Sequence, residues 1–251
     1  SILCIIDLHT YYTYIPVYLR QDVNDTTIII PVKDEEVGLL FLLQDYKESN
    51  ISAIMDINFI FVIDCRTSDN SKNVASKFSE IIINQDKTHG KGAAIRQALE
   101  TWKKNKTEYV VFMDADGSYC FKDVMTIINA LENDHDVVSG SRFLLKNKDL
   151  RNMSLLHNFG NRALSLISSI RNRRKISDLC TGLWGFNSKS IEILNLKSKG
   201  FDLEAEIAGK AKKNNLNHKE VPVTWNQRRG GFSKLKSFRD GFVILIRVIF
   251  R

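Results

Sequence analysis

One segment, YVVFMDADGSY at residues 109–119, constrains the fold of this 251-residue chain more than any other. Its β-branched and aromatic residues predict a buried strand, which ends at Asp114, Asp116 and Gly117. Side chains two residues apart in an extended chain point to the same side, so the two carboxylates are expected to converge, with Ser118 continuing the alternation. Such hard oxygen ligands favour Mg²⁺ or Mn²⁺. The alternative is a polar turn in which Asp116 lies near a helix cap.

Four further strands are predicted, and helical segments alternate with them. The strands cover residues 26–32, 58–64, 80–84 and 136–141. This alternation predicts an α/β fold with a mainly parallel sheet and right-handed crossovers. The carboxyl ends of parallel strands meet at one edge, where open α/β sheets bind ligands. We therefore expect one edge of the sheet to carry Asp64, Asp114, Asp116 and Arg142.

Further elements are predicted after Arg142. Residues 155–170 have helical periodicity, and strands are predicted at residues 177–186 and 218–225. The first of these strands contains small residues at Thr181, Gly182 and Gly185, which suit close approach to a ligand or another backbone.

Two segments have compositions suited to phosphate. THGKG at residues 88–92 precedes a predicted helix, so a phosphate can approach backbone amides there, with Lys91 as counter-charge. Its spacing matches neither a P-loop nor a dinucleotide fingerprint. The second segment, NQRRGGFSKLK at residues 226–236, is a predicted loop whose paired arginines, paired glycines and lysine suit the wrapping of a phosphate.

Charge is unevenly distributed along the chain. Residues 1–125 contain 13 Lys and Arg against 18 Asp and Glu, whereas the remainder contains 23 against 11. Acidic and basic halves facing one cleft suit a metal-bound, multiply anionic substrate, although a solvated basic surface is the commoner explanation. A basic nucleic-acid-binding domain is a further alternative. The chain has no interleaved aromatic and basic residues and no recognisable motif of that kind, so no nucleic-acid partner is expected.

Cysteine and hydropathy patterns indicate the compartment. The four cysteines are scattered and form no CxxC pair, which favours a reducing, cytoplasmic environment. No signal peptide is evident, and no window reaches the roughly 18 apolar residues of a spanning helix. The apolar segment at residues 242–251 has three interpretations: an amphipathic helix at a membrane surface, the start of a longer segment, or a helix packed on the core.

Nine motifs occur in an order that resembles family 2 glycosyltransferases of GT-A fold, in particular the branch of polyprenyl- and dolichyl-phosphate sugar synthases. They are IIIPVKDEE (28–36), VIDCRTSD (62–69), GKGAAIRQAL (90–99), FMDADGSY (112–119), VVSGSRF (137–143), SDLCTGLWGF (177–186), GFDLEAEI (200–207), VPVTW (221–225) and RRGGFSKL (228–235). The resemblance implies a Rossmann-like, mainly parallel sheet sandwiched by helices. It divides the chain into an N-terminal extension (1–25), a GT-A domain (26–241) and an apolar C-terminal helix end (242–251).

The resemblance also implies roles for individual residues. The metal and the diphosphate of a nucleotide sugar would be held by Asp114 and Asp116, with Ser118 as a third metal ligand. The nucleotide-sugar pocket would further include Pro31, Lys33, Glu35, Asp64, Lys91 and Ala115. Donor or acceptor phosphates would be bound by Arg142, Arg228, Arg229, Ser233 and Lys234. The sugar and the acceptor would be bordered by Asp178, Glu204 and Glu206. The candidate catalytic residues are thus Asp114, Asp116, Asp178 and Arg142.

These roles predict inverting transfer of a hexose from a nucleotide diphosphate sugar to a polyprenyl or dolichyl phosphate, by a peripheral protein at the cytoplasmic face of a membrane. UDP-glucose, UDP-N-acetylglucosamine and GDP-mannose are the candidate donors, and the wording DLCTGLWGF favours UDP. A phosphate acceptor is already anionic at neutral pH and needs no strong base. The alternative acceptor is a glycan or protein hydroxyl, which would require a base from Asp178, Glu204 or Glu206.

Two departures from the family pattern are Cys65, in place of a second Asp, and Cys120, in place of Pro.

Overall fold

A computed structural model of the protein describes residues 25–86, 90–145, 155–230 and 237–250. The expected N-terminal extension, apart from Asp25, lies outside these residues, and so do Ser233 and Lys234.

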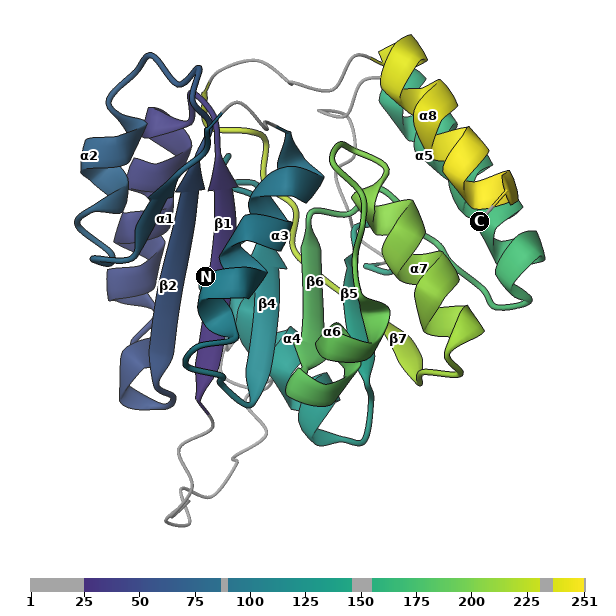
Figure 1. Ribbon diagram of the computed structural model, residues 1–251, viewed down its shortest axis with the longest axis horizontal. Coiled ribbons are helices and arrows are strands. Elements are labelled where there is room, and N and C mark those ends of the chain that lie inside the picture. Colours follow the sequence, from purple (N-terminus) through teal and green to yellow (C-terminus); the bar gives the residue numbers. More distant parts are fainter. Residues whose placement is uncertain (1–24, 87–89, 146–154, 231–236, 251) are drawn as a thin grey trace, which may run out of the picture.

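The described residues form a seven-stranded sheet in the order β3-β2-β1-β4-β6-β5-β7 (Figure 1). All neighbouring strands are parallel except at β6, which runs antiparallel to β4 and to β5. The expectation of a mainly parallel sheet is therefore confirmed. The strands are β1 (Thr26–Val32), β2 (Ile57–Ile63), β3 (Ile82–Asn84), β4 (Tyr109–Met113), β5 (Val137–Ser141), β6 (Leu183–Asn187) and β7 (His218–Pro222).

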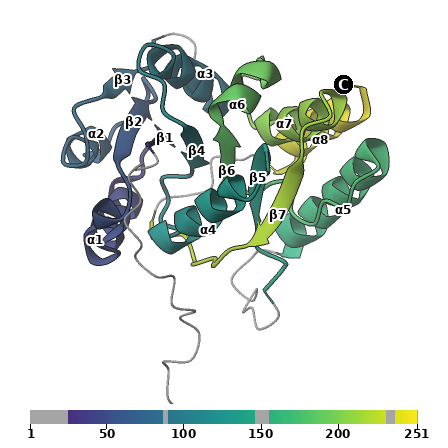
Figure 2. The same ribbon diagram turned by 90° about the horizontal axis from the view of Figure 1, so that it is seen from below.

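Helices cover both faces of the sheet, which explains why its central strands are continuous apolar runs (Figure 2). Ile28 and Ile30 of β1 join the core on one face, and Ile29 joins the core on the other. The first face is covered by α1 (Glu36–Glu48), α2 (Ser71–Ala75) and α4 (Phe121–Glu132). The second is covered by α3 (Lys91–Trp102), α6 (Ser188–Leu194) and α7 (Leu203–Lys213). A 3-10 turn, Ile51–Ala53, precedes β2.

Two further helices, α5 (Leu155–Asn172) and α8 (Ser237–Phe250), lie side by side beyond α7 (Figure 1). The inner face of α8 buries Ile244 and Val248 in the second core. Its Arg247 guanidinium forms a buried ion pair with Asp202 at the start of α7. Among the described helices, none combines the length and apolarity needed to cross a bilayer.

The segment before β6 differs from the sequence prediction. We expected a strand throughout residues 177–186, but the strand begins only at Leu183. The preceding backbone is held by side chains of α5 instead of ladder hydrogen bonds: Leu179 N donates to Ser165 Oγ, and Cys180 N donates to Asn161 Oδ1. A loop fixed in this way enters the carboxyl edge of the sheet, where β6 then starts.

Acid pH is expected to destabilise the fold through His218 of β7. The His218 ring lies 2.8 Å from Ser139 Oγ and stacks on Trp184. Burial lowers its pKa from 6.5 to about 3, so between these values the unfolded chain binds a proton that the folded chain does not. This contribution to stability is complete above pH 6.5 and is lost as the pH falls toward 3, with a slope of about 1.4 kcal/mol per pH unit.

Denaturant unfolding of the wild type and of His218→Gln across this pH range measures the effect. The variant should lose that part of the pH dependence. Identical slopes in the two proteins would contradict the assignment.

Candidate active site

A cavity of about 1400 Å³ lies at the carboxyl edge of the sheet. It is bounded by the ends of β1, β2, β4 and β5, as the parallel arrangement of these strands requires. Most of the residues singled out in the sequence line it: Pro31, Lys33, Glu35, Asp64, Lys91, Asp114, Ala115, Asp116, Ser118, Arg142 and Arg228. The predicted edge thus brings these side chains to one cavity.

Asp114 is paired with a buried lysine at the start of α3. Lys91 Nζ lies 2.7 Å from Asp114 Oδ1 and 2.7 Å from Glu204 Oε1. Burial alone would lower the pKa of Lys91, but the two carboxylates raise it above its ordinary value, so the amine stays charged. Burial also raises the pKa of Glu204, and Lys91 partly offsets that rise. The triad joins β4, α3 and α7 at the cavity wall.

Asp116 is held on two sides. Its Oδ1 accepts hydrogen bonds from the Ser118 backbone N at 3.0 Å and from Ser118 Oγ at 2.5 Å. Its Oδ2 lies 3.0 Å from one terminal guanidinium nitrogen of Arg228. The other terminal nitrogen of Arg228 lies 2.6 Å from Glu35 Oε1. The two carboxylates therefore line the same cavity, but each has its own cationic partner.

Two glycines allow the Asp114–Asp116 segment to fit where it does. A Cβ at Gly182 would lie 1.9 Å from Asp114 Oδ2, and a Cβ at Gly38 would lie 2.4 Å from the carbonyl oxygen of Ala115. The sequence indicated a close approach at Gly182 without its partner, which is the Asp114 side chain. Gly38 was not singled out, because a glycine inside a helix gives no sign of what packs on it.

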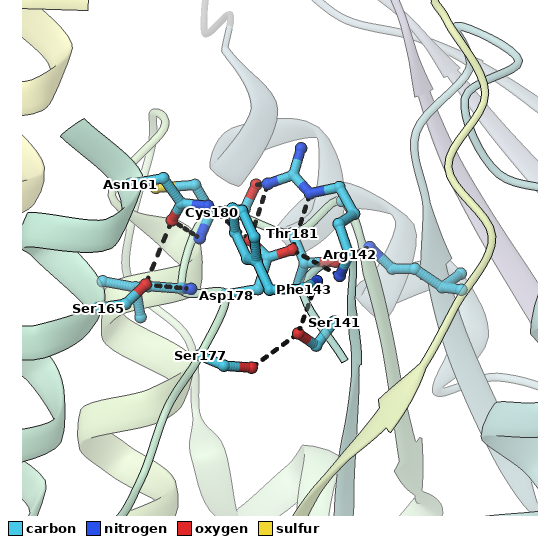
Figure 3. A network of polar contacts seen from close by, with 12 residues as sticks. Ser141, Arg142, Phe143, Asn161, Ser165, Ser177, Asp178, Cys180 and Thr181 are labelled. Atoms are coloured by element: carbon cyan, nitrogen blue, oxygen red, sulfur yellow. Dashed lines mark hydrogen bonds and ion pairs between the residues drawn. The ribbon is translucent and has the colours of Figure 1, made fainter. Parts of the chain in front are cut away.

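Arg142, directly after β5, is fixed by a bidentate ion pair with Asp178 (Figure 3). Arg142 Nε donates to Asp178 Oδ2 at 2.7 Å, and a terminal guanidinium nitrogen donates to Asp178 Oδ1 at 2.8 Å. The Arg142 backbone N and the Asn161 side chain also donate to this carboxylate. Burial would raise the pKa of Asp178, but the charge and hydrogen bonds of Arg142 lower it below the ordinary value.

This network decides what Asp178 can do. Its carboxylate is fully buried, accepts four hydrogen bonds and does not line the cavity, whereas Arg142 does. Asp178 thus orients Arg142 and has no route to an acceptor proton. Glu220 of β7 supports the same loop by accepting hydrogen bonds from the backbone N atoms of Ser177 and Asp178. Neither Asn161 nor Glu220 was predicted, because both contacts join segments far apart in the chain.

Asp64 at the end of β2 carries its own arginine. Asp64 Oδ1 accepts hydrogen bonds from the backbone N and Nε of Arg66, and Oδ2 accepts one from a terminal nitrogen at 2.7 Å. These hydrogen bonds from Arg66 lower the pKa of Asp64. Cys65, the departure from the family pattern, is exposed beside this pair.

Two other charged residues, Arg229 and Glu206, lie away from the cavity wall. Arg229 stacks on Phe41, with its guanidinium carbon 4.3 Å from the ring centroid, and its backbone N donates to the Asp116 carbonyl. Glu206 accepts hydrogen bonds from the backbone N atoms of Lys197 and Ser198, so it anchors the loop before α7. Neither side chain lines the cavity.

The oxygen atoms of Asp114, Asp116 and Ser118 fit a divalent cation of the Mg²⁺ or Mn²⁺ type. Both carboxylates already attract positive charge, since nitrogen cations lie 2.7 Å and 3.0 Å from them. Within the described residues, no three His, Cys, Asp or Glu side chains come together into a closed metal site. Proteins commonly bind Mg²⁺ through one or two carboxylates, with water and substrate phosphates completing the shell.

The fold is that of GT-A glycosyltransferases. Glucosyl-3-phosphoglycerate synthase from Mycobacterium tuberculosis, solved in complex with Mn²⁺, UDP and glucosyl-3-phosphoglycerate, superposes with a TM-score of 0.68 over 90% of this chain and 80% of that protein. The two sequences are 14% identical, so this similarity concerns the fold alone.

Residues 27–194 match the family model for glycosyl transferase family 2, and the chain belongs to this family. It is 27% identical to glycosyltransferase AglJ of Haloferax volcanii, over 88% of this chain and 70% of that protein. It is 25% identical to a UDP-N-acetylglucosamine–dolichyl-phosphate N-acetylglucosaminyltransferase of Methanococcus voltae, over 88% of this chain and 94% of that protein. The protein is a glycosyltransferase of the hexosyltransferase class, homologous to dolichyl-phosphate sugar transferases.

Gly182→Ala is expected to displace the Asp114 carboxylate and break its pair with Lys91. A Cβ 1.9 Å from Asp114 Oδ2 cannot be accommodated without movement, and overpacking of this kind typically costs about 1–3 kcal/mol. Gly160→Ala is the matched control, because nothing lies within 4 Å of a Cβ there. In helix α5 that change should be neutral or stabilising by up to about 1 kcal/mol. Urea unfolding compares the variants, and equal stabilities would contradict the close approach.

Proposed function

We propose that the protein transfers a hexose from a nucleotide diphosphate sugar to a polyprenyl phosphate, with inversion at the anomeric carbon. The observation that carries this proposal is the composition of the cavity. One part is lined by charged groups, including Asp114, Asp116 and Lys91, and the other by apolar side chains of α5, of α8 and of the loop before α7. The apolar part includes Leu164, Ile167, Phe201, Ile244 and Leu245. A charged donor and an acceptor with a hydrocarbon tail match these two parts.

Charges along the cavity support phosphate at both substrates. Lys91 and Arg228 stand at the two carboxylates that are the candidate metal ligands, where donor phosphates would bind. Arg142, whose orientation is fixed by Asp178, supplies a further guanidinium for an acceptor phosphate. The names of the relatives in Methanococcus voltae and Haloferax volcanii, which include dolichyl-phosphate transferases, support the same acceptor class.

Metal ligation would fall to Asp114, Asp116 and Ser118. A bound Mg²⁺ or Mn²⁺ would neutralise the charge that develops on the leaving diphosphate. A phosphate acceptor, with a second pKa of about 6, is already an anionic nucleophile at neutral pH. Such an acceptor needs no strong base, which suits a site in which the Asp178 carboxylate has no access to the cavity. Because such an acceptor resides in a lipid leaflet, the protein would work as a peripheral protein at the cytoplasmic face of a membrane.

One observation favours a second candidate, transfer to a glycan or protein hydroxyl. Glu204 lines the cavity, and burial raises its pKa, as is common for a general base. Its pairing with Lys91 makes it the weaker candidate, since the ammonium stabilises the ionised carboxylate and lowers its basicity.

Transfer from a radiolabelled nucleotide sugar tests the acceptor class. Incubation with Mn²⁺ and polyprenyl phosphate should give a product extractable into organic solvent. Asp116→Ala should reduce turnover by at least about a hundredfold, because it removes a candidate ligand of the metal that would neutralise the charge developing on the leaving diphosphate. Asp240→Ala, a change of another acid at the cavity, is a charge-matched control and should retain turnover to a larger extent. Label found only in water-soluble glycan or protein would overturn the polyprenyl phosphate acceptor.

The Asp64–Arg66 pair supports a uridine nucleotide over a guanosine nucleotide. Asp64 Oδ1 already accepts two hydrogen bonds and Oδ2 accepts one, which leaves one acceptor position beside the remaining N–H groups of Arg66. Uracil presents one N–H donor flanked by carbonyl acceptors, so one acceptor and one donor satisfy it. Guanine presents two N–H donors on that edge, and one of them would stay unpaired at a cost of about 1–3 kcal/mol.

Arg66→Ala is therefore expected to narrow the preference for UDP over GDP by about tenfold, since it frees both oxygens of Asp64. Isothermal titration of both nucleotides with Mn²⁺ measures the two affinities. Lys72→Ala, which removes a nearby positive charge outside the cavity, is the control and should leave the ratio unchanged. A UDP to GDP ratio that is the same in the wild type and Arg66→Ala would contradict this role of Arg66.

A further inference from the structure

Helix α5 departs from the pattern of an ordinary surface helix. Its most buried side chains are polar and several of its exposed ones are large and apolar, although Leu164 and Ile167 pack partly buried against the second core. The side chains that it buries against the body of the protein are Asn161, Ser165, Ser168 and Asn172. On the opposite side, Phe159 is 75% exposed, Leu166 62% and Ile170 70%. A helix at a water-facing surface normally does the opposite. The outer side of α5 is thus built for an apolar environment.

Helix α8, next to α5, extends this apolar surface. Its buried residues, Ile244 and Val248, are four positions apart on one side of the helix. The other side exposes Phe242, Val243, Ile246, Ile249 and Phe250, whose spacing of one, three and four residues forms a continuous stripe. Phe242 is 63% exposed and Phe250 76%. Exposed apolar patches of this extent mark interaction sites.

The surroundings of the stripe are basic. No acidic residue occurs in α5, and α8 contains one, Asp240. An open groove on the outer side of α5 is lined by Leu166 and Ile170 together with Arg162, Arg173, Arg174 and Lys175. Arg173 and Lys175 are exposed. Apolar side chains flanked by Lys and Arg are the composition of helices that lie in the interface of an anionic bilayer.

The same two helices form part of the catalytic cavity. Leu164 and Ile167 of α5 line it, and so do Ile244 and Leu245 of α8. Phe242 belongs both to the cavity wall and to the exposed stripe, so the cavity reaches the outer surface at the start of α8.

We propose that the outer sides of α5 and α8 form a single docking face that binds the surface of an anionic lipid bilayer. The face consists of the exposed apolar residues of the two helices named above and the basic groove beside α5. The helices lie in the plane of the interface, where amphipathic helices sink roughly 5–10 Å into the headgroup region. The choice of a membrane as the partner rests on the proposed function, because a membrane would present a polyprenyl phosphate substrate to the cavity.

Charge favours a bilayer over a second copy of the chain as the occupant of this face. A symmetric dimer through the face would bring the same surface of both copies together. Arg162, Arg173 and Lys175 of one copy would then approach the same cluster of the other, with only Asp240 available as an acid on either helix. Anionic headgroups instead match the cluster, because the negative surface potential of an anionic leaflet attracts nearby Lys and Arg side chains.

Flotation of the full chain with lipid vesicles tests the proposal. The wild type should bind vesicles of phosphatidylglycerol and phosphatidylcholine, bind pure phosphatidylcholine far more weakly, and dissociate as salt is raised. Two double variants, Leu166→Gln with Ile170→Gln and Ile246→Gln with Phe250→Gln, should each bind about tenfold or more weakly, because each removes two inserted apolar side chains. Arg173→Gln with Lys175→Gln should reduce binding mainly at low salt.

The matched control is Leu40→Gln with Ile54→Gln, which removes two exposed apolar side chains from α1 and the turn after it. It should bind vesicles as the wild type does. All variants are at exposed positions, so thermal unfolding should show that they remain folded. Docking variants that bind as tightly as the wild type, or equal binding to charged and neutral vesicles, would overturn the proposal. Sedimentation showing a dimer that these variants dissociate would assign the face to a second copy instead.

The outcome is separable from that of the proposed function. Asp116→Ala should bind vesicles as the wild type does, since it leaves the docking face untouched. The docking variants should keep transfer to a short-chain, water-soluble polyprenyl phosphate and lose transfer to a long-chain one held in vesicles. Vesicle binding without any transfer would refute the proposed function alone, and transfer without vesicle binding would refute the docking face alone.

Discussion

The pairing of Lys91 with Asp114 and Glu204 is the contact on which the cavity depends. It joins the end of the central strand β4 to the first residue of α3 and the first turn of α7, so one ammonium group ties three elements that are distant in sequence. Lys91 and Glu204 are largely shielded from water, whereas Asp114 is one third exposed. Removal of one partner from a buried ion pair costs about 3–5 kcal/mol. Arg228 performs a similar task for Asp116 and Glu35. The carboxylates are thereby held in place by the protein's own cations.

Two halves of the cavity differ in construction, and in the sheet the antiparallel strand β6 lies between β4 and β5, the strands that lead into them. The half with Asp64, Asp114 and Asp116 is made by residues that leave the ends of parallel strands. The half with Arg142 depends on the loop that leads into β6, which is held by Asn161, Ser165 and Glu220. Gly182, the residue before β6, lies against Asp114 and joins the halves. Substitutions in the α5 half can therefore alter the position of Arg142 while the ends of β1 and β2 stay as they are.

Much of the half with Asp64 and Asp114 could be predicted from the sequence, because two simple rules apply to it. Buried parallel strands are continuous apolar runs, and their carboxyl ends share an edge, so Asp64, Asp114 and Arg142 could be assigned to one cavity. Long-range partners could not be predicted: Asn161 and Glu220 act through contacts that only packing creates. The short helix α6 was missed, since seven residues give too little periodicity. Periodicity predicted α5 correctly but not its orientation, because its apolar stripe faces outward, contrary to the usual pattern.

The burial of polar side chains by α5, with large apolar side chains exposed on its other side, has a mechanical consequence. The side of the helix that faces the body holds Asn161, which donates to Asp178, and Asp178 in turn fixes Arg142 at the cavity wall (Figure 3). The opposite side presents Phe159, Leu166 and Ile170 to the surroundings. Only the thickness of one helix separates these two sides, so a tilt or shift of α5 imposed from outside moves the anchor of Arg142 directly. Arg142 is thus anchored to α5 through Asp178 as well as to the sheet, so the position of α5 helps to set where this guanidinium lies in the cavity.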